Sequence, residues 1–222
     1  MPTGKDVLQV AISQIGIKES PANSNRVKYN TWYYGKEVSG SAYPWCMAFV
    51  QWCYQRAGVT LPFKTASCGA LLRWYHTNAP ECIVKNPQPG DIVIFDFPGG
   101  ADTDHTGLLE SVAANTVTTI DGNTGTTSDA NGGAVMRRTR DKSAVKAYIR
   151  PRELEDDMPR FNTIAEIKGA APWAVDTVKK LINKKALTGS GKKDAEGLPA
   201  DMDLSLDMLR ALVINDRMGL YK

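Results

Sequence analysis

The sequence predicts an α+β domain followed by a small helical module. The 222-residue chain opens with amphipathic helical patterns, and short alternating segments typical of strands come only after residue 90. Helices first and strands afterwards favour an α+β architecture over a parallel sheet built from alternating strands and helices. A charged stretch between prolines, 151–159, predicts a linker between a first domain, 1–150, and a module, 160–222.

Three amphipathic segments in the first half of the chain predict helices. Apolar residues recur with helical spacing over 6–15, 44–57 and 65–78. Gly16 and Gly58 follow the first two segments, where glycine commonly ends a helix. The residues between these two helices, up to about Gly40, are mostly polar and are predicted to form a loop.

The second half of the first domain predicts an antiparallel sheet. Short runs of β-branched and apolar residues predict strands over 91–97, 106–112, 116–120, 134–138 and 146–149. The turn at 113–115 is short, so the second and third strands should be antiparallel. That pairing would bring residues 121–123 back beside residue 105.

Cys46 lies in a setting that suits a catalytic nucleophile. It follows Pro44 and Trp45 at the start of the predicted helix 44–57. Free N–H groups and the helix dipole favour an anion there, and the thiolate is the nucleophilic form of cysteine. A neighbouring imidazolium and a helix N-terminus together can lower a thiol pKa to roughly 3.5–7.5. The alternative is a buried core cysteine, which is what we expect of Cys53, two turns further along the same apolar stripe.

His105 is the candidate general base. The chain has only two histidines, and His76 lies at the end of the predicted helix 65–78, where it is expected to cap carbonyls or face solvent. His105 precedes an apolar run predicted to be a strand. A thiol at a helix N-terminus facing an imidazole on a strand is typical of a cysteine hydrolase and points to acyl transfer.

Asp121 and Asn123 are the candidates to orient the imidazole of His105. Side chains alternate along a strand, so the two would share a face, and the antiparallel pairing would place them near His105. The alternative is that Asp121-Gly122-Asn123 is only a turn, because these residue types dominate turns.

Four motifs together resemble the CHAP domain, the cysteine- and histidine-dependent amidohydrolase/peptidase of cell-wall hydrolases. They are Trp45-Cys46-x-x-Phe49-x-x-Trp52-Cys53, Pro89-Gly90-Asp91-Ile92-Val93, Asp104-His105-Thr106-Gly107 and Asp121-Gly122-Asn123, spread over about residues 5–150. The resemblance implies a papain-like fold that cleaves peptidoglycan, with Cys46 as nucleophile, His105 as base and Asp121 or Asn123 as the orienting group. Many relatives carry glutamate where Asp121 stands.

Further residues are expected to support this chemistry. Backbone N–H groups at the start of the Cys46 helix would hold the oxyanion, and Trp45 and Tyr43 are candidate substrate contacts. Gln14 is a candidate oxyanion donor, although a glutamine on an amphipathic helix is usually solvated. The segment 19–26 contains a single carboxylate, Glu19, so we expect no tight calcium site; no other metal and no cofactor are expected.

Composition limits the remaining function classes. The net charge is +3, all of it within residues 1–150, and no basic stripe favours nucleic-acid binding. No apolar run approaches the roughly 20 residues of a membrane span, so no membrane insertion is expected. The N-terminus does not resemble a signal peptide. With the family resemblance, this predicts a phage endolysin held in the host cytoplasm until the membrane is permeabilised, which then acts on the cell wall.

The module 160–222 is predicted to contain two helices joined through Gly189-Ser190-Gly191. Pro172 begins the first, and Ser205 is the expected N-cap of the second, which ends near Gly219. The module resembles those appended to wall hydrolases of Gram-positive bacteria and their phages. We therefore expect it to bind Gram-positive peptidoglycan or to form a homo-oligomer.

Two other functions stay open for the whole chain. An NlpC-type peptidoglycan endopeptidase would use the same cysteine and histidine on the same fold, and only the cleaved bond would distinguish it from an N-acetylmuramoyl-L-alanine amidase. A non-catalytic cell-wall-binding protein is less favoured, because every side chain that the chemistry requires is present.

Overall fold

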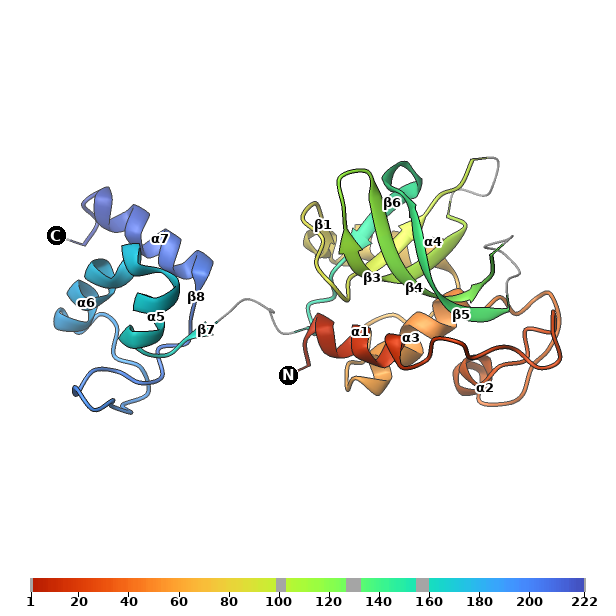
Figure 1. The fold of residues 1–222 in the computed structure, drawn as a ribbon, viewed down its shortest axis with the longest axis horizontal. Helices are drawn as coiled ribbons and strands as arrows, with labels where there is room; N and C mark the ends of the chain where they lie inside the picture. Colours follow the sequence, from red (N-terminus) through yellow and green to blue (C-terminus); the bar gives the residue numbers. More distant parts are fainter. Residues whose placement is uncertain (1, 99–102, 127–132, 155–159, 222) are drawn as a thin grey trace. The chain divides into compact units, whose positions relative to one another are not determined.

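The computed structural model describes residues 2–98, 103–126, 133–154 and 160–221. It divides into two compact units, Met1–Asp157 and Met158–Lys222 (Figure 1). The division lies within the predicted linker 151–159, of which residues 155–159 are outside the described residues. Each unit has a hydrophobic core of its own.

In its described residues, unit 1 combines four α-helices with a six-stranded antiparallel sheet, in agreement with the predicted α+β class. The helices are α1 (Gly4–Ile12), α2 (Lys28–Tyr34), α3 (Cys46–Arg56) and α4 (Cys68–Asn78), followed by a 3₁₀ turn at Pro80–Cys82. The strands are β1 (Ile83–Val84), β2 (Ile92–Phe95), β3 (His105–Val112), β4 (Thr116–Thr124), β5 (Ala134–Asp141) and β6 (Val145–Ile149). Their order in the sheet is β1-β6-β2-β3-β4-β5.

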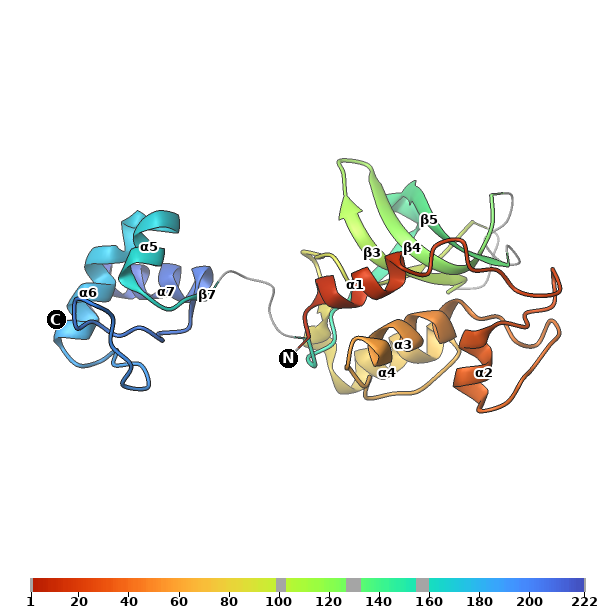
Figure 2. The same cartoon turned by 60° about the horizontal axis from the view of Figure 1, so that its bottom comes forward.

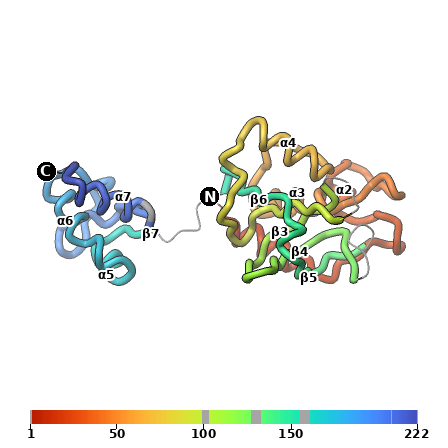
Figure 3. Tube along the Cα trace, turned by 90° about the horizontal axis from the view of Figure 1, so that it is seen from above, coloured from red at the N-terminus to blue at the C-terminus, as the bar shows by residue number. Residues whose placement is uncertain are grey.

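Helices α1 and α3 cover one face of the sheet (Figures 1 and 2). The main core lies between this face and the helices, and nearly every side chain of α3 is buried in it. Seen from above, α4 and the strands β3 to β5 lie on opposite sides of α3 (Figure 3). The other face of the sheet carries a smaller apolar cluster, made of Val93, Phe95, Leu109 and Val117. Helix α3 is therefore the central element of the unit, and its N-terminus carries Cys46.

The predicted hairpin is present, and its second strand is longer than expected. Strands β3 and β4 pair with Leu108 opposite Ile120, and the turn closes with a hydrogen bond from Ala113 N to the Thr116 carbonyl. Strand β4 continues to Thr124 instead of ending at residue 120. Residues 121–123 therefore belong to a strand, and the alternative that they form only a turn is wrong.

The predicted polar loop between the first two helices contains a helix, α2. Tyr29 explains why: its ring is fully buried and packs against Trp45, Phe49 and Trp52 of the next helical segment. Only two residues of this short helix are buried, so its sequence shows little amphipathic periodicity. Tertiary packing stabilises α2, and the local pattern did not reveal it.

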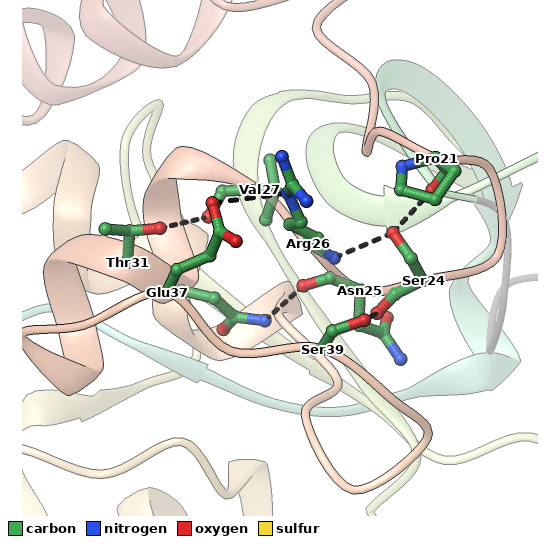
Figure 4. A network of polar contacts seen from close by, with 9 residues as sticks. Pro21, Ser24, Asn25, Arg26, Val27, Thr31, Glu37 and Ser39 are labelled. Carbon is green, nitrogen blue, oxygen red and sulfur yellow. Dashed lines mark hydrogen bonds and ion pairs between the residues drawn. The ribbon is translucent and has the colours of Figure 1, made fainter.

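The segments that flank α2 are ordered by their own polar groups (Figure 4). Ser24 accepts a hydrogen bond from the Arg26 amide, and its carbonyl accepts one from the Ser39 hydroxyl at 3.0 Å. Arg26 and Glu37 form an ion pair at 3.3 Å, and Asn25 donates to the Gly40 carbonyl at 3.1 Å. These bonds join the chain before α2 to the chain after it, so the segment leading to Cys46 is held in place.

Over residues 160–221, unit 2 contains three α-helices and a two-stranded ribbon. Its elements are β7 (Arg160–Phe161), α5 (Ile164–Ala170), a 3₁₀ turn at Pro172–Ala174, α6 (Val175–Asn183), β8 (Leu204–Ser205) and α7 (Leu206–Arg217). Helices α6 and α7 confirm the two predicted helices, and Ser205 caps α7 by accepting from the Met208 amide. The prediction missed α5. None of the described helices, in either unit, is long and apolar enough to cross a membrane.

Strand β3 offers a test of the core. Leu108 is fully buried, so Leu108→Ala should lower the free energy of unfolding by about 2–5 kcal/mol, through lost apolar contacts and a residual cavity. Val112→Ala, on the exposed end of the same strand, should change it by less than about 0.5 kcal/mol. Denaturant titration followed by tryptophan fluorescence measures this, because four of the five tryptophans lie in unit 1. Equal losses in the two variants would contradict the assigned burial.

Candidate active site

Cys46 is the first residue of α3, which begins two residues after the predicted start at Pro44. Trp45 is the N-cap, but its side chain makes no capping hydrogen bond. Instead its indole is fully buried and stacks on Tyr29 with the ring centroids 5.4 Å apart. The backbone N–H groups of the first helical turn have no partner within the helix, so they are available to an anion.

The surroundings of Cys46 favour its thiolate form. The pKa of Cys46 lies well below the ordinary value of a thiol, chiefly because of a hydrogen bond with Cys68. His105 lowers it further through a hydrogen bond and its positive charge, and the Met47 amide does so through a hydrogen bond. Burial acts in the opposite direction, since only 6% of the side chain is exposed. The hydrogen bonds and the imidazolium outweigh this penalty, and Cys46 is suited to attack as a thiolate.

His105 begins β3, opposite Phe95 of β2. Its Nε2 lies 3.0 Å from Oδ2 of Asp121, which leaves Nδ1 as the ring nitrogen for the thiol of Cys46. Burial lowers the pKa of His105, but the hydrogen bonds and charges of Asp121 and Cys46 outweigh it and raise the pKa to about 9. An imidazolium paired with a thiolate is the consistent charge state of this site at neutral pH.

The Asp121 carboxylate is hydrogen-bonded to His105 and also forms an ion pair with an arginine. This carboxylate is completely buried, and Oδ2 also lies 2.6 Å from a guanidinium nitrogen of Arg140 on β5. Burial alone would raise the pKa of Asp121, whereas the hydrogen bond and charge of His105 and the charge of Arg140 lower it. The guanidinium of Arg140 lies over the ring of Phe95 at 4.8 Å, within cation–π range.

Asn123 does not share the position of Asp121. The pairing of β4 with β5 shifts register between Asp121 and Thr124, and Asn123 adopts a left-handed backbone with φ of 57°. This bulge breaks the alternation that would have put both side chains on one face. Asn123 is buried, and its Oδ1 has no hydrogen-bond partner among the described residues. The geometry therefore favours Asp121 over Asn123 as the orienting group.

Two glycines permit the close approaches around Asp121. A Cβ at Gly107 would overlap Oδ1 of Asp121, and a Cβ at Gly122 would meet the side chains of Phe49 and Trp45. Asp121 and Gly122 point to opposite faces of the sheet, the first toward His105 and the second toward α3. These two glycines allow the carboxylate to reach the imidazole while α3 packs against the strand behind it.

The other predicted contact residues lie in different settings. Trp45 is fully buried, so it supports the start of α3, and its side chain offers no exposed surface for the predicted contact with substrate. Tyr43 is half-buried against Tyr34, with ring centroids 5.1 Å apart. Gln14 lies beyond the end of α1, and its side-chain oxygen accepts from Lys28 and Tyr29. The carboxamide oxygen of Gln14 is therefore bonded to Lys28 and Tyr29 and not to the Cys46 site.

Sequence reasoning missed two residues of the site, Arg140 and Cys68. Arg140 follows Arg137 and Arg138, and only the strand register, which pairs it with Val117, turns its side chain inward. Cys68 is the first residue of α4, and its Sγ lies 3.9 Å from Sγ of Cys46. No local pattern marks either residue, because both contacts depend on packing between distant elements.

Neither a metal site nor a disulfide is built from these groups. In the described ranges of the chain, no cluster of three or more histidine, cysteine, aspartate or glutamate side chains is arranged to hold a metal ion. All four cysteines are free, and Cys53 is fully buried in the core, as predicted.

A known protein family matches the part of the chain that contains Cys46 and His105. The family model of the CHAP domain matches residues 38–123, which include Cys46, His105 and Asp121 but not Arg140. The match agrees with the resemblance found in the motifs and with a papain-like α+β fold. A search of curated proteins finds no match.

Solved structures with a similar arrangement include two endolysins. The crystal structure of a wild type endolysin, LysIME-EF1, aligns with a TM-score of 0.44 and 18% identity over 73% of this chain and 70% of that one. Ly7917 aligns with a TM-score of 0.40 and 17% identity over 67% of this chain and 62% of its own. An NLP/P60-family protein, similar to lipoprotein, from Staphylococcus aureus subsp. aureus Mu50 aligns with a TM-score of 0.33 and 14% identity, over 70% of this chain and 44% of that one.

Gly107→Ala should disturb the pairing of His105 with Asp121. The added methyl group would displace the carboxylate, so the pKa of His105 should fall from about 9 by at least about one unit. Titration of the His105 ring protons by NMR measures this shift. Gly169→Ala is the matched control, because a Cβ there meets nothing within 4 Å. A folded Gly107→Ala variant with an unchanged His105 pKa would show that this approach is not required.

Proposed function

Because residues 38–123 match the CHAP domain family, we propose that this chain is a peptidoglycan hydrolase that cleaves an amide bond by cysteine catalysis. The observation that carries the proposal is the continuous polar chain from Cys46 through His105 to Asp121, which begins at a helix N-terminus. A buried, charge-paired thiolate in such a position has few structural uses and is suited to nucleophilic attack.

The first half of the reaction forms an acyl-enzyme. The Cys46 thiolate attacks an amide carbonyl of the peptide stem, and the charge that develops on its oxygen is held by backbone N–H groups at the start of α3. His105 holds the proton that came from the thiol and delivers it to the nitrogen of the leaving amine. The C–N bond then breaks, and a thioester joins the substrate to Cys46.

The second half of the reaction releases the product. His105, now neutral, takes a proton from a water molecule, which attacks the thioester and returns Cys46 to its thiolate form. Asp121 keeps the same ring nitrogen of His105 engaged in both halves, so the imidazole does not turn away from the thiol. Asp121 and Arg140 thus act through His105 and not on the substrate.

The finer parts of the proposal concern the bond and the biological setting. An N-acetylmuramoyl-L-alanine amidase and an NlpC-type endopeptidase would use the same groups, so both remain candidates. A phage endolysin that reaches the wall from the host cytoplasm after membrane permeabilisation is the setting that the motifs favour. Tyr43 is the candidate substrate contact that is still half-exposed.

Unit 2 is proposed to bind the wall. Trp173 is 44% exposed and lines a hollow of about 400 Å³ together with Arg210, Val213, Ile214 and Arg217. An exposed indole beside guanidinium groups suits a sugar ring that carries carboxylates or phosphates, which are groups of bacterial wall polymers. Self-association is the second candidate, because Ile214, Met218 and Leu220 are also exposed in this unit.

Cys46→Ala and His105→Ala should each abolish digestion of purified Gram-positive peptidoglycan. We expect the rate to fall by at least about 10³-fold, because each variant removes a group that forms or breaks bonds. Mass spectrometry of the released fragments measures the loss, and the new termini in the parent digest identify the cleaved bond. His76→Ala is the matched control, since His76 is exposed and is the only other histidine. Digestion by Cys46→Ala at the parental rate would rule out the mechanism.

Trp173→Ala should weaken binding of the full chain to cell walls. In a Cys46→Ala background, which leaves the wall intact, we expect at least about a tenfold loss of affinity in a sedimentation assay. Lys168→Ala, exposed on α5, is the control within the same unit. Analytical ultracentrifugation of the same variants tests self-association. If the parent neither sediments with walls nor self-associates, both proposals for unit 2 fail.

A further inference from the structure

Cys68 is a second thiol within the site, contributed by a different helix. Its Sγ lies 3.9 Å from Sγ of Cys46, within hydrogen-bond range for sulfur. Each cysteine is the first residue of its helix, and only 6% of Cys46 and 7% of Cys68 are exposed. Two buried thiols therefore meet where the N-termini of α3 and α4 converge.

Two contacts fix the start of α4 at this place. Gln51 of α3 is buried and donates to the Thr65 carbonyl at 2.7 Å and to the Phe63 carbonyl at 3.3 Å, which ties the chain entering α4 to α3. Gly69 has no side chain, and a Cβ there would lie 2.6 Å from Oγ1 of Thr103, just before His105. The first turn of α4 is thus held against both the nucleophile helix and the strand that carries His105.

We propose that Cys68 is a positioning residue for the nucleophile, whose thiol donates a hydrogen bond to the Cys46 thiolate. In a buried site, each donor to an anion has a large effect, because the fold shields the anion from solvent. Of the two thiols, Cys46 is the one that His105 contacts, and the positive charge of the imidazolium favours the thiolate of Cys46. The hydrogen bond with Cys46 and burial raise the pKa of Cys68, and the charges of Cys46 and Asp104 raise it further, so Cys68 keeps its proton.

This inference deepens the proposed function and rests on it for its consequence in catalysis. Cys68 does not contact the reacting carbonyl in the scheme above; it acts through Cys46. Losing its hydrogen bond should leave Cys46 intact but protonated over a wider range of pH. A role in packing alone would change stability and would leave the titration of Cys46 where it is.

The test is the pH dependence of Cys46 alkylation by iodoacetamide, from about pH 4 to about pH 10, followed by peptide mass spectrometry at Cys46. In Cys68→Ala the midpoint should move up by about one to two pH units, because a hydrogen bond to a charged group is lost. Cys68→Ser keeps a donor and should restore at least half of that shift. Cys82→Ala, which removes a free cysteine outside the site, should leave the midpoint unchanged.

A midpoint in Cys68→Ala within about 0.3 units of the parent would overturn the proposal, as would an equal shift in Cys68→Ser. Should Cys68→Ala fail to fold, Cys68→Val removes the donor while filling the space with a somewhat larger apolar side chain, and takes its place. Alkylation requires no wall substrate, so it decides the role of Cys68 even if peptidoglycan is not digested. If peptidoglycan is digested, the acidic limb of kcat/KM should move up with the alkylation midpoint.

Discussion

The hydrogen bond between His105 and Asp121 is the interaction on which the site depends. Both side chains are buried, so neither charge can be satisfied by water, and each requires a partner fixed by the fold. Cys46 lies on one side of the pair and Arg140 on the other, which gives alternating negative and positive groups from thiolate to guanidinium. Burial strengthens the attraction between each pair of neighbouring charges, and it also makes each charged group dependent on its neighbour.

The architecture of unit 1 follows from bringing these groups together. Cys46 comes from a helix, His105 from the start of β3, Asp121 from the neighbouring strand β4, and Arg140 from β5, on the far side of β4. Gly107 and Gly122 have no side chains, so Asp121 can approach β3 and α3 can pack against β4. Next to Cys46, Trp45 stacks on Tyr29 in a buried aromatic contact that holds the start of α3 in place. The position of Cys46 therefore depends on core packing as much as on its own helix.

Local sequence signals predicted much of this arrangement. Pro44 and the apolar stripe after it marked the start of α3, and the short turn at 113–115 marked the β3–β4 hairpin, which brings residue 121 toward His105. In unit 2 the sequence at the start of α5 contains an N-capping pattern that also predicts a helix. Thr163 and Glu166 form a reciprocal capping box, a pattern readable from their spacing alone.

The sequence by itself determined the α+β class, the position of Cys46 at a helix start, and His105 as the candidate base, because these depend on periodicity, on a proline and on having two histidines in the chain. Only the tertiary structure placed Asp121, and not Asn123, against His105, because a bulge and a left-handed residue break the strand alternation there. The same is true of Arg140 and Cys68, and of helix α2. Their places depend on strand register and on packing between elements far apart in the chain, where local hydrophobic patterns carry no information.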